Sequence, residues 1–172
     1  TPKQMFEINK LGEPGLVFSD AEKRIYPHGS LVSHVLGSVG VDNQPSAGVE
    51  LYFNERLSDP LRSGEPLELS IDIRLQHILN QELNNYMEKF SAKGGAGLIL
   101  DAKTGEVLAL SSLPDFDPNE NNDPTDPSRF NQILQGVYEL GSGFKTFTIA
   151  SGLESNVVDL GGGYDASKPV RV

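Results

Sequence analysis

The stretch IRLQHILNQELNNYMEKFSAKGGAGLILDAKTGEVLAL, residues 73–110, carries the two patterns that decide the fold. Between Ile73 and Phe90, apolar residues recur every three or four positions, which is the spacing of one face of an α-helix. Asp72 is a suitable N-cap for this helix, and the pair Gly94-Gly95 can end it. The first half of the stretch therefore predicts an amphipathic helix over residues 73–90.

The second half of the stretch predicts a β-hairpin. Two apolar runs, at residues 96–100 and 106–110, flank the turn-rich sequence DAKTG. Gly105 is the residue of this turn that best tolerates a positive φ. A long helix followed by a hairpin indicates a mixed α+β fold.

The sequence before this stretch is made of short apolar runs that Pro and Gly interrupt, as in GEPG at residues 12–15. Such punctuation predicts irregular, strand-containing structure over residues 1–66. The alternating segment LELSI, residues 67–71, predicts a half-buried strand. We therefore expect one region at residues 1–66 and a second that begins at residue 67.

After the hairpin, the sequence predicts a loop and two helices. Residues 114–127 are rich in Pro, Asp and Asn, so we expect an exposed loop, followed by a helix at residues 129–135. A second helix is predicted from Ser142 to about Glu154, with Ser155-Asn156 as its stop.

Composition excludes several kinds of function. The 172 residues include 14 Lys and Arg against 24 Asp and Glu, a net charge of −10, so counterion release cannot drive binding to a nucleic acid. The chain has no Cys, and its three His are not in metal-ligand spacing, so we expect no metal and no cofactor. No apolar window or basic leader suggests that this chain spans a membrane or carries its own export signal.

The candidate catalytic residues are Ser142 and Lys145, which are three positions apart. Residues with this spacing on a helix share a face, so a hydroxyl lies near an amine. A lysine in a water-poor pocket, or beside a second cation, loses its proton more easily and can act as the general base for a serine nucleophile. The N–H groups at the start of a helix favour the oxyanion formed when a carbonyl is attacked.

The spacing alone does not decide between this chemistry and an ordinary helix start. A chain of this composition contains roughly one S-x-x-K match by chance. The alternative is a helix that begins at a capping serine and has a solvated lysine one turn later.

Longer segments resemble the class B penicillin-binding proteins, the peptidoglycan transpeptidases, and most closely their division-specific FtsI type. The resemblance covers nearly the whole chain. It includes a pedestal-like region, the start of the transpeptidase module, its first hairpin, the segment that ends in the nucleophile motif and the stretch after it. These are RIYPHG with the residues that follow (24–50), LELSIDIRLQ (67–76), GLILDAKTGEVLALSSLPDFDPN (97–119), RFNQILQGVYELGSGFK (129–145) and YDASKPVRV (164–172).

The resemblance implies an α+β fold in which residues 1–66 form a non-catalytic, β-containing pedestal and residues 67–172 form the N-terminal part of a serine β-lactamase-like transpeptidase domain. It implies that Ser142 is the nucleophile that attacks a D-alanyl-D-alanine carbonyl and that Lys145 is its general base. The triplet K-T-G at residues 103–105 falls in the first hairpin and precedes Ser142, whereas the catalytic K-T-G of such enzymes follows the serine. We interpret it as a turn.

Two features depart from the family pattern. Leu140 and Gly143 stand where the family motif has Pro and Thr, and no S-x-N or later K-[ST]-G occurs in the sequence. Those missing elements would supply the second proton-relay group, the second cation and half of the oxyanion hole. We therefore expect a fragment of a longer protein, without its membrane anchor and inactive by itself, from the periplasmic side of the bacterial inner membrane.

The function that the resemblance implies is cross-linking of peptidoglycan stem peptides at the septum. β-Lactams would be covalent inhibitors, and other proteins of division and cell-wall synthesis would be partners. Two alternatives stay open: a non-catalytic scaffold or interaction fragment of a division protein, and an elongation-type class B penicillin-binding protein.

Overall fold

The computed structural model describes residues 2–19, 23–40, 43–120, 123, 125–163 and 167. The chain divides into two compact units, Thr1–Gln135 and Gly136–Val172. The predicted boundary at residues 66 and 67 lies inside the first unit and stays a prediction. Among the described helices, none has the length and apolar character that a bilayer span requires.

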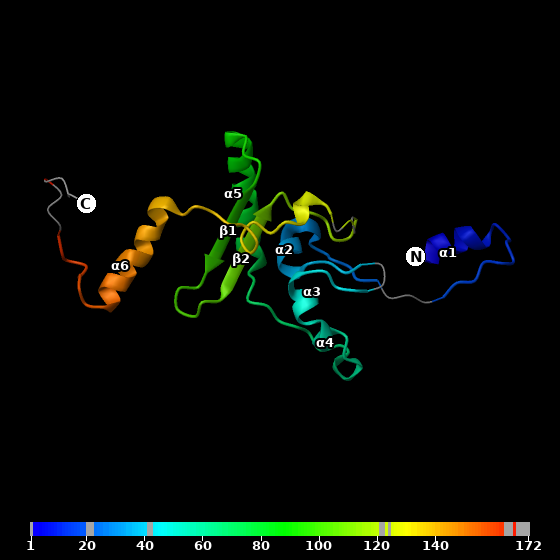
Figure 1. The fold of residues 1–172 in the computed structure, drawn as a ribbon. Helices are drawn as coiled ribbons and strands as arrows, with labels where there is room; N and C mark the ends of the chain where they lie inside the picture. Colours follow the sequence, from blue (N-terminus) through cyan, green and yellow to red (C-terminus); the bar gives the residue numbers. More distant parts are fainter. Residues whose placement is uncertain are drawn as a thin grey trace. The chain divides into compact units, whose positions relative to one another are not determined.

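The centre of the first unit is helix α5 (Ile73–Phe90), which packs on the antiparallel hairpin of β1 (Gly95–Leu100) and β2 (Val107–Leu113), as Figure 1 shows. A Cβ atom at Gly97 would lie 2.7 Å from Leu79 Cδ1, so the glycine allows the helix to approach β1 closely. Gly105 in the turn has a φ of 76°. The predicted helix and hairpin are both confirmed, and so is the mixed α+β class.

The two ends of α5 are capped by hydrogen bonds. The Asp72 carboxylate accepts the Arg74 backbone N–H at 2.9 Å, as predicted for an N-cap, and hydrogen bonds from the Arg74 side chain and backbone lower the pKa of Asp72 to about 2. At the other end, Ser91 has left-handed dihedrals, and the Ala92 N–H donates to Met87 O at 2.9 Å. This is a Schellman-type end. The prediction that Gly94-Gly95 ends the helix is therefore wrong.

The segment at residues 67–71 is not a strand, contrary to the alternating pattern. The outer edge of β2 is already occupied by later residues: the Asp72 N–H donates to Leu108 O at 2.8 Å, and the Gln76 side chain bonds the backbone of Leu110. The preceding residues contact β2 through a side chain instead, since Ser70 Oγ donates to Val107 O at 2.7 Å.

The region before α5 is mostly short helices, which corrects the expectation of strands in the pedestal. The described part of residues 2–66 contains no strand, only an isolated antiparallel bridge between Val39 and Pro45. The helical segments are α1 (Pro2–Asn9), η1 (Gly29–Val32), α2 (Ser33–Leu36), α3 (Gly48–Tyr52), α4 (Asn54–Leu57) and η2 (Pro60–Arg62).

Two glycines explain why the chain turns so often in this region. Gly37 and Gly48 have φ values of 80° and 63°. A Cβ atom at Gly37 would lie 1.9 Å from Ala47 O, so two backbone segments cross here in contact. Only glycine fits such a crossing, and a paired strand could not continue through it.

The segment after β2 was predicted to be an exposed loop, but some of its described residues are buried. Phe116 is buried, and η3 (Pro127–Arg129) is a single short turn. Asn131 Oδ1 then accepts the N–H groups of Ile133 and Leu134 at 3.0 and 3.1 Å. These bonds fold residues 131–135 into one capped turn, so the predicted helix at residues 129–135 is wrong.

The second unit contains η4 (Gly141–Phe144) and α6 (Lys145–Glu154). The predicted helix from Ser142 is thus confirmed, with a 3₁₀ first turn. Asn156 has a φ of 55°, and the Val157 N–H donates to Gly152 O at 3.0 Å. This left-handed end confirms the predicted stop.

Candidate active site

Ser142 and Lys145 lie at the junction of the two helical segments of the second unit. Ser142 belongs to η4, Lys145 is the first residue of α6, and the Lys145 backbone N–H bonds to Ser142 O. In a 3₁₀ turn, residues three apart eclipse one another along the axis. The backbone therefore places both residues on one face, which is the arrangement that the spacing predicted.

The surroundings of this pair are open. Both residues are exposed, and among the described residues neither side chain has a hydrogen bond or ion pair. In the part of the chain that the structure describes, the expected water-poor pocket around Lys145 is therefore not formed, and the Ser142 hydroxyl does not bond the Lys145 amine. What the structure supplies is the order and spacing of the two groups.

Apolar side chains flank the pair on both sides. The rings of Phe144 and Phe147 lie 5.6 Å apart, and both are more than half exposed. Ile149 and Leu140 are exposed to a similar degree. No other described segment covers these four apolar side chains.

Gly141 and Gly143 bracket the serine and differ in backbone conformation. Gly141 has a φ of 52°, a left-handed value, whereas Gly143 does not. A Cβ atom at either position would meet no atom within 4 Å. Space alone thus gives no reason for the glycine at 143, where the resembling family has Thr.

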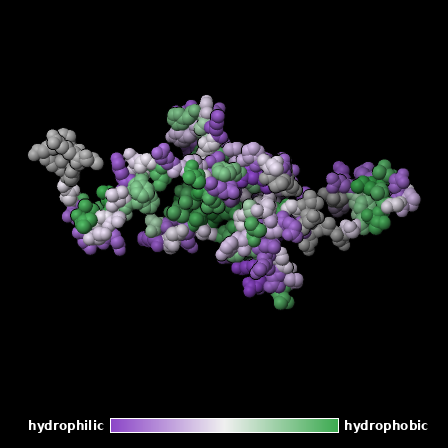
Figure 2. Space-filling view, in the orientation of Figure 1, coloured by the Kyte–Doolittle hydropathy of each residue, from purple (hydrophilic) through white to green (hydrophobic). Residues whose placement is uncertain are grey.

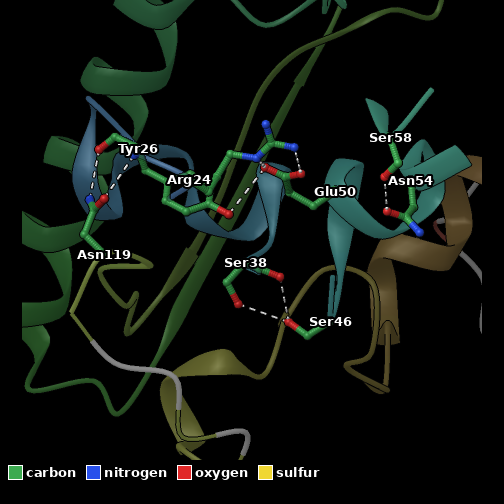
Figure 3. Close-up of polar contacts among 8 residues, drawn as sticks. All are labelled: Arg24, Tyr26, Ser38, Ser46, Glu50, Asn54, Ser58 and Asn119. Carbon is green, nitrogen blue, oxygen red and sulfur yellow. Dashed lines mark hydrogen bonds and ion pairs between the residues drawn. The ribbon is translucent and has the colours of Figure 1, made fainter. Parts of the chain in front are cut away.

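A second polar group, missed from the sequence, holds the first unit together. The buried Glu50 accepts from Arg24 at 2.9 Å on both carboxylate oxygens and from the Tyr26 hydroxyl at 3.3 Å (Figure 3). Burial, followed by the charge of Glu50, raises the pKa of Tyr26 to about 12. No local sequence pattern predicts this contact, because Arg24 and Glu50 are 26 residues apart in the sequence.

Asn119 fixes the same tyrosine from the other side. Its side-chain amide accepts from the Tyr26 N–H at 3.0 Å and donates to Tyr26 O at 2.9 Å (Figure 3). This residue lies in the loop after β2, so the pedestal-like region and the hairpin region are joined by direct hydrogen bonds. Among the described residues, no group of three or more His, Asp or Glu side chains could hold a metal ion.

A known family profile matches the part of the chain that contains the hairpin and the Ser142–Lys145 pair. The profile described as "Penicillin binding protein transpeptidase domain" matches residues 95–168, which include the hairpin, Ser142 and Lys145. Residues 95–168 therefore match the transpeptidase domain of the penicillin-binding proteins, and this match covers less than half of the chain.

Two relatives align with most or all of the chain. It is 39% identical to the probable peptidoglycan D,D-transpeptidase FtsI of Caulobacter vibrioides, with all of this chain and 29% of that protein aligned. It is 34% identical to the stage V sporulation protein D of Bacillus subtilis, over 90% of this chain and 28% of that protein. The chain thus spans less than a third of the length of these relatives.

A solved structure supports the fold. The crystal structure of a peptidoglycan synthetase from Bifidobacterium adolescentis aligns with the whole chain at a TM-score of 0.67 and 21% identity, covering 36% of that protein. The K-T-G at residues 103–105 forms the exposed β1–β2 turn, where Asp101 accepts two backbone N–H groups. It is a turn, as the sequence predicted.

Proposed function

We propose that this chain carries the nucleophile and general base of a peptidoglycan D,D-transpeptidase. Ser142 Oγ would attack the carbonyl between the two D-alanines of a stem peptide, while Lys145 Nζ takes the hydroxyl proton. Lys145 passes this proton to the nitrogen of the terminal D-alanine, which leaves as a free amine, and an ester to Ser142 remains. The amine of a second stem peptide then attacks this ester, which forms the cross-link and releases the serine.

The observation that carries this proposal is the S-x-x-K pair at the start of α6 inside the segment that matches the family profile. A chance S-x-x-K could fall anywhere in the sequence, whereas this one follows the hairpin within the matched segment. The chain is also 39% identical to a probable FtsI. The same-face placement in a 3₁₀ turn supports a proton transfer between these two side chains.

The finer role follows from the relatives' names. We infer septal synthesis, because the chain is similar to a probable FtsI, and we infer β-lactams as covalent inhibitors of the same serine. The site would act on the periplasmic side of the inner membrane, alongside other proteins of division and cell-wall synthesis.

Labelling of the complete gene product with benzylpenicillin tests the proposal. Ser142 Oγ would bond to the lactam carbonyl while the lactam C–N bond breaks, and nothing leaves. Intact mass should therefore increase once, by the whole mass of the β-lactam. Ser142→Ala and Lys145→Ala should abolish the adduct. The matched controls Ser151→Ala, on α6, and Lys103→Ala, in the K-T-G turn, should label normally.

The exposure of Ser142 and Lys145 favours a second candidate, a non-catalytic scaffold. If the complete gene product stays unlabelled while it is folded by circular dichroism, the transpeptidase proposal fails and the scaffold is supported. For residues 1–172 alone, we expect little labelling, because Ser142 and Lys145 are both exposed and the Ser142 hydroxyl does not bond the Lys145 amine.

A further inference from the structure

A histidine joins two segments of the first unit that are far apart in the sequence. His34 lies on α2, and its Nε2 atom is 3.4 Å from Pro114 O, in the first residue after β2. The ring also packs at 85° to the ring of the buried Phe116, with centroids 5.4 Å apart. The transpeptidase proposal gives this contact no role.

Side-chain amides attach the loop 114–119 to the rest of the first unit as well. Asn80 Nδ2, on α5, donates to Asp115 Oδ2 at 3.2 Å, and Asn119 bonds both backbone groups of Tyr26 at 3.0 and 2.9 Å. An amide keeps the same charge at every ordinary pH, whereas an imidazole changes its charge between pH 5 and 8. The histidine is therefore the attachment that responds to pH near neutrality.

The charged groups around His34 come from two neighbouring segments. Asp115 is the carboxylate whose charge favours the protonated ring. Arg129, whose guanidinium lies 4.4 Å from the centroid of the Phe116 ring, is a cation and opposes it. Among the elements packed on α2, α3 supplies Glu50, which is held in the ion pair described above, whereas η1, β2 and the rest of α2 have no ionisable side chain.

Burial has the largest effect on the charge of the ring. It lowers the pKa of His34 by more than Asp115 and hydrogen bonds to the backbone of Pro114 and Ser128 raise it. While the loop is closed, the ring is therefore neutral near pH 7. When the loop moves away, the ring is solvated and regains the ordinary pKa of about 6.5. The open loop then binds a proton more readily, so a fall in pH favours opening.

We propose that His34 is a pH-sensitive latch, in which the neutral ring holds the loop 114–119 against α2 and the protonated ring releases it. In the sequence, this loop lies between the hairpin and the unit that contains Ser142. Its release therefore loosens part of the chain that joins them. The latch uses only residues of the first unit and does not depend on acylation at Ser142.

Amide hydrogen exchange of the full chain tests the proposal. The Tyr26 amide donates to Asn119 at 3.0 Å and becomes free when the loop opens, so its protection factor reports the opening constant. Between pH 7 and pH 5, this constant should rise at least about threefold, and at most about 25-fold if the closed ring stays neutral. Amides of α6, in the other unit, should keep their protection. Unchanged protection at Tyr26 overturns the proposal.

Variants separate the titration of His34 from other effects of acid. His34→Gln keeps a hydrogen-bond donor but does not titrate, so the protection at Tyr26 should change less than about twofold. His77→Gln, at an exposed histidine on α5, should follow the parent. A rise of the parental size in His34→Gln contradicts the latch. If His34→Gln does not fold, the ring C–H signals of the parent decide, because titration of His34 at or above the ordinary value of about 6.5 overturns the proposal and titration below it supports the latch.

Discussion

The side-chain amide of Gln76 pairs with the backbone of Leu110 as a neighbouring strand would. Gln76 Nε2 donates to Leu110 O at 2.7 Å, and the Leu110 N–H donates to Gln76 Oε1 at 2.9 Å. Nε2 also donates to Leu31 O at 2.9 Å. One fully buried glutamine on α5 therefore closes the edge of β2 and joins it to η1.

Replacing Gln76 should be costly, because Leu would leave the two buried backbone groups of Leu110 and the partly buried Leu31 O without this partner. Each unsatisfied group costs about 1–3 kcal/mol, so we expect Gln76→Leu to lower the free energy of unfolding by about 3 kcal/mol or more. Urea unfolding followed by circular dichroism measures this change. In a folded Gln76→Leu protein, the Leu110 amide should also exchange with solvent much faster.

Gln81 provides the control for this change, since it lies on the same helix and is exposed. Gln81→Leu should alter stability by less than about 0.5 kcal/mol. Equal losses in the two variants would mean that the amide pairing contributes nothing special.

Ser91 should be a site of easy stabilisation. It ends α5 with a φ of 51° and a ψ of 39°, a conformation that costs a residue with a Cβ atom and costs glycine nothing. Ser91→Gly should therefore raise the free energy of unfolding by about 0.5–1 kcal/mol. Gln81→Gly, in mid-helix, should lower it by about 1 kcal/mol. A loss of stability in Ser91→Gly would contradict the left-handed assignment.

Local patterns predicted the elements that depend on local causes. The period of α5, the Asp72 cap and the Gly105 turn are each visible within a few residues. The S-x-x-K pair is also local, so its order and shared face could be predicted. The uncovered surface around it could not, because burial depends on which segments pack against α6.

Hydrogen bonds between residues far apart in the sequence could not be predicted from such local patterns. Gln76 and Asn119 each use one side-chain amide to bond both backbone groups of a residue far away in the sequence, and neither leaves a periodic signal. The alternation at residues 67–71 predicted a strand, but these residues do not pair in a sheet. Figure 2 shows apolar surface over the hairpin, where Leu98 and Leu100 are half exposed.

The raised pKa of Tyr26 predicts a specific loss of stability in alkali. Its ordinary pKa is about 10, and in the folded chain burial and Glu50 raise it to about 12. Between these values the unfolded tyrosine loses its proton while the folded one keeps it, so the folded state binds more protons and stability falls as pH rises. Below pH 10 the effect is absent.

Denaturation midpoints from pH 9 to 12 test this assignment. The parent should lose stability more steeply than Tyr26→Phe, which has no hydroxyl to ionise, whereas Tyr138→Phe, at an exposed ring, should follow the parent. Identical slopes for the parent and Tyr26→Phe would contradict a raised pKa at this residue.

The two glycines beside Ser142 should respond oppositely to alanine. Gly143 has ordinary helical space and no positive φ, so Gly143→Ala should stabilise the start of α6 by about 1 kcal/mol. Gly141 has equal space but a φ of 52°, so Gly141→Ala should cost about 1 kcal/mol. Helicity of the peptide 136–163 and urea unfolding of the chain would measure both. Because the two sites differ only in backbone conformation, changes of the same sign would show that η4 does not have the described geometry, and the shared face of Ser142 and Lys145 would lose its support.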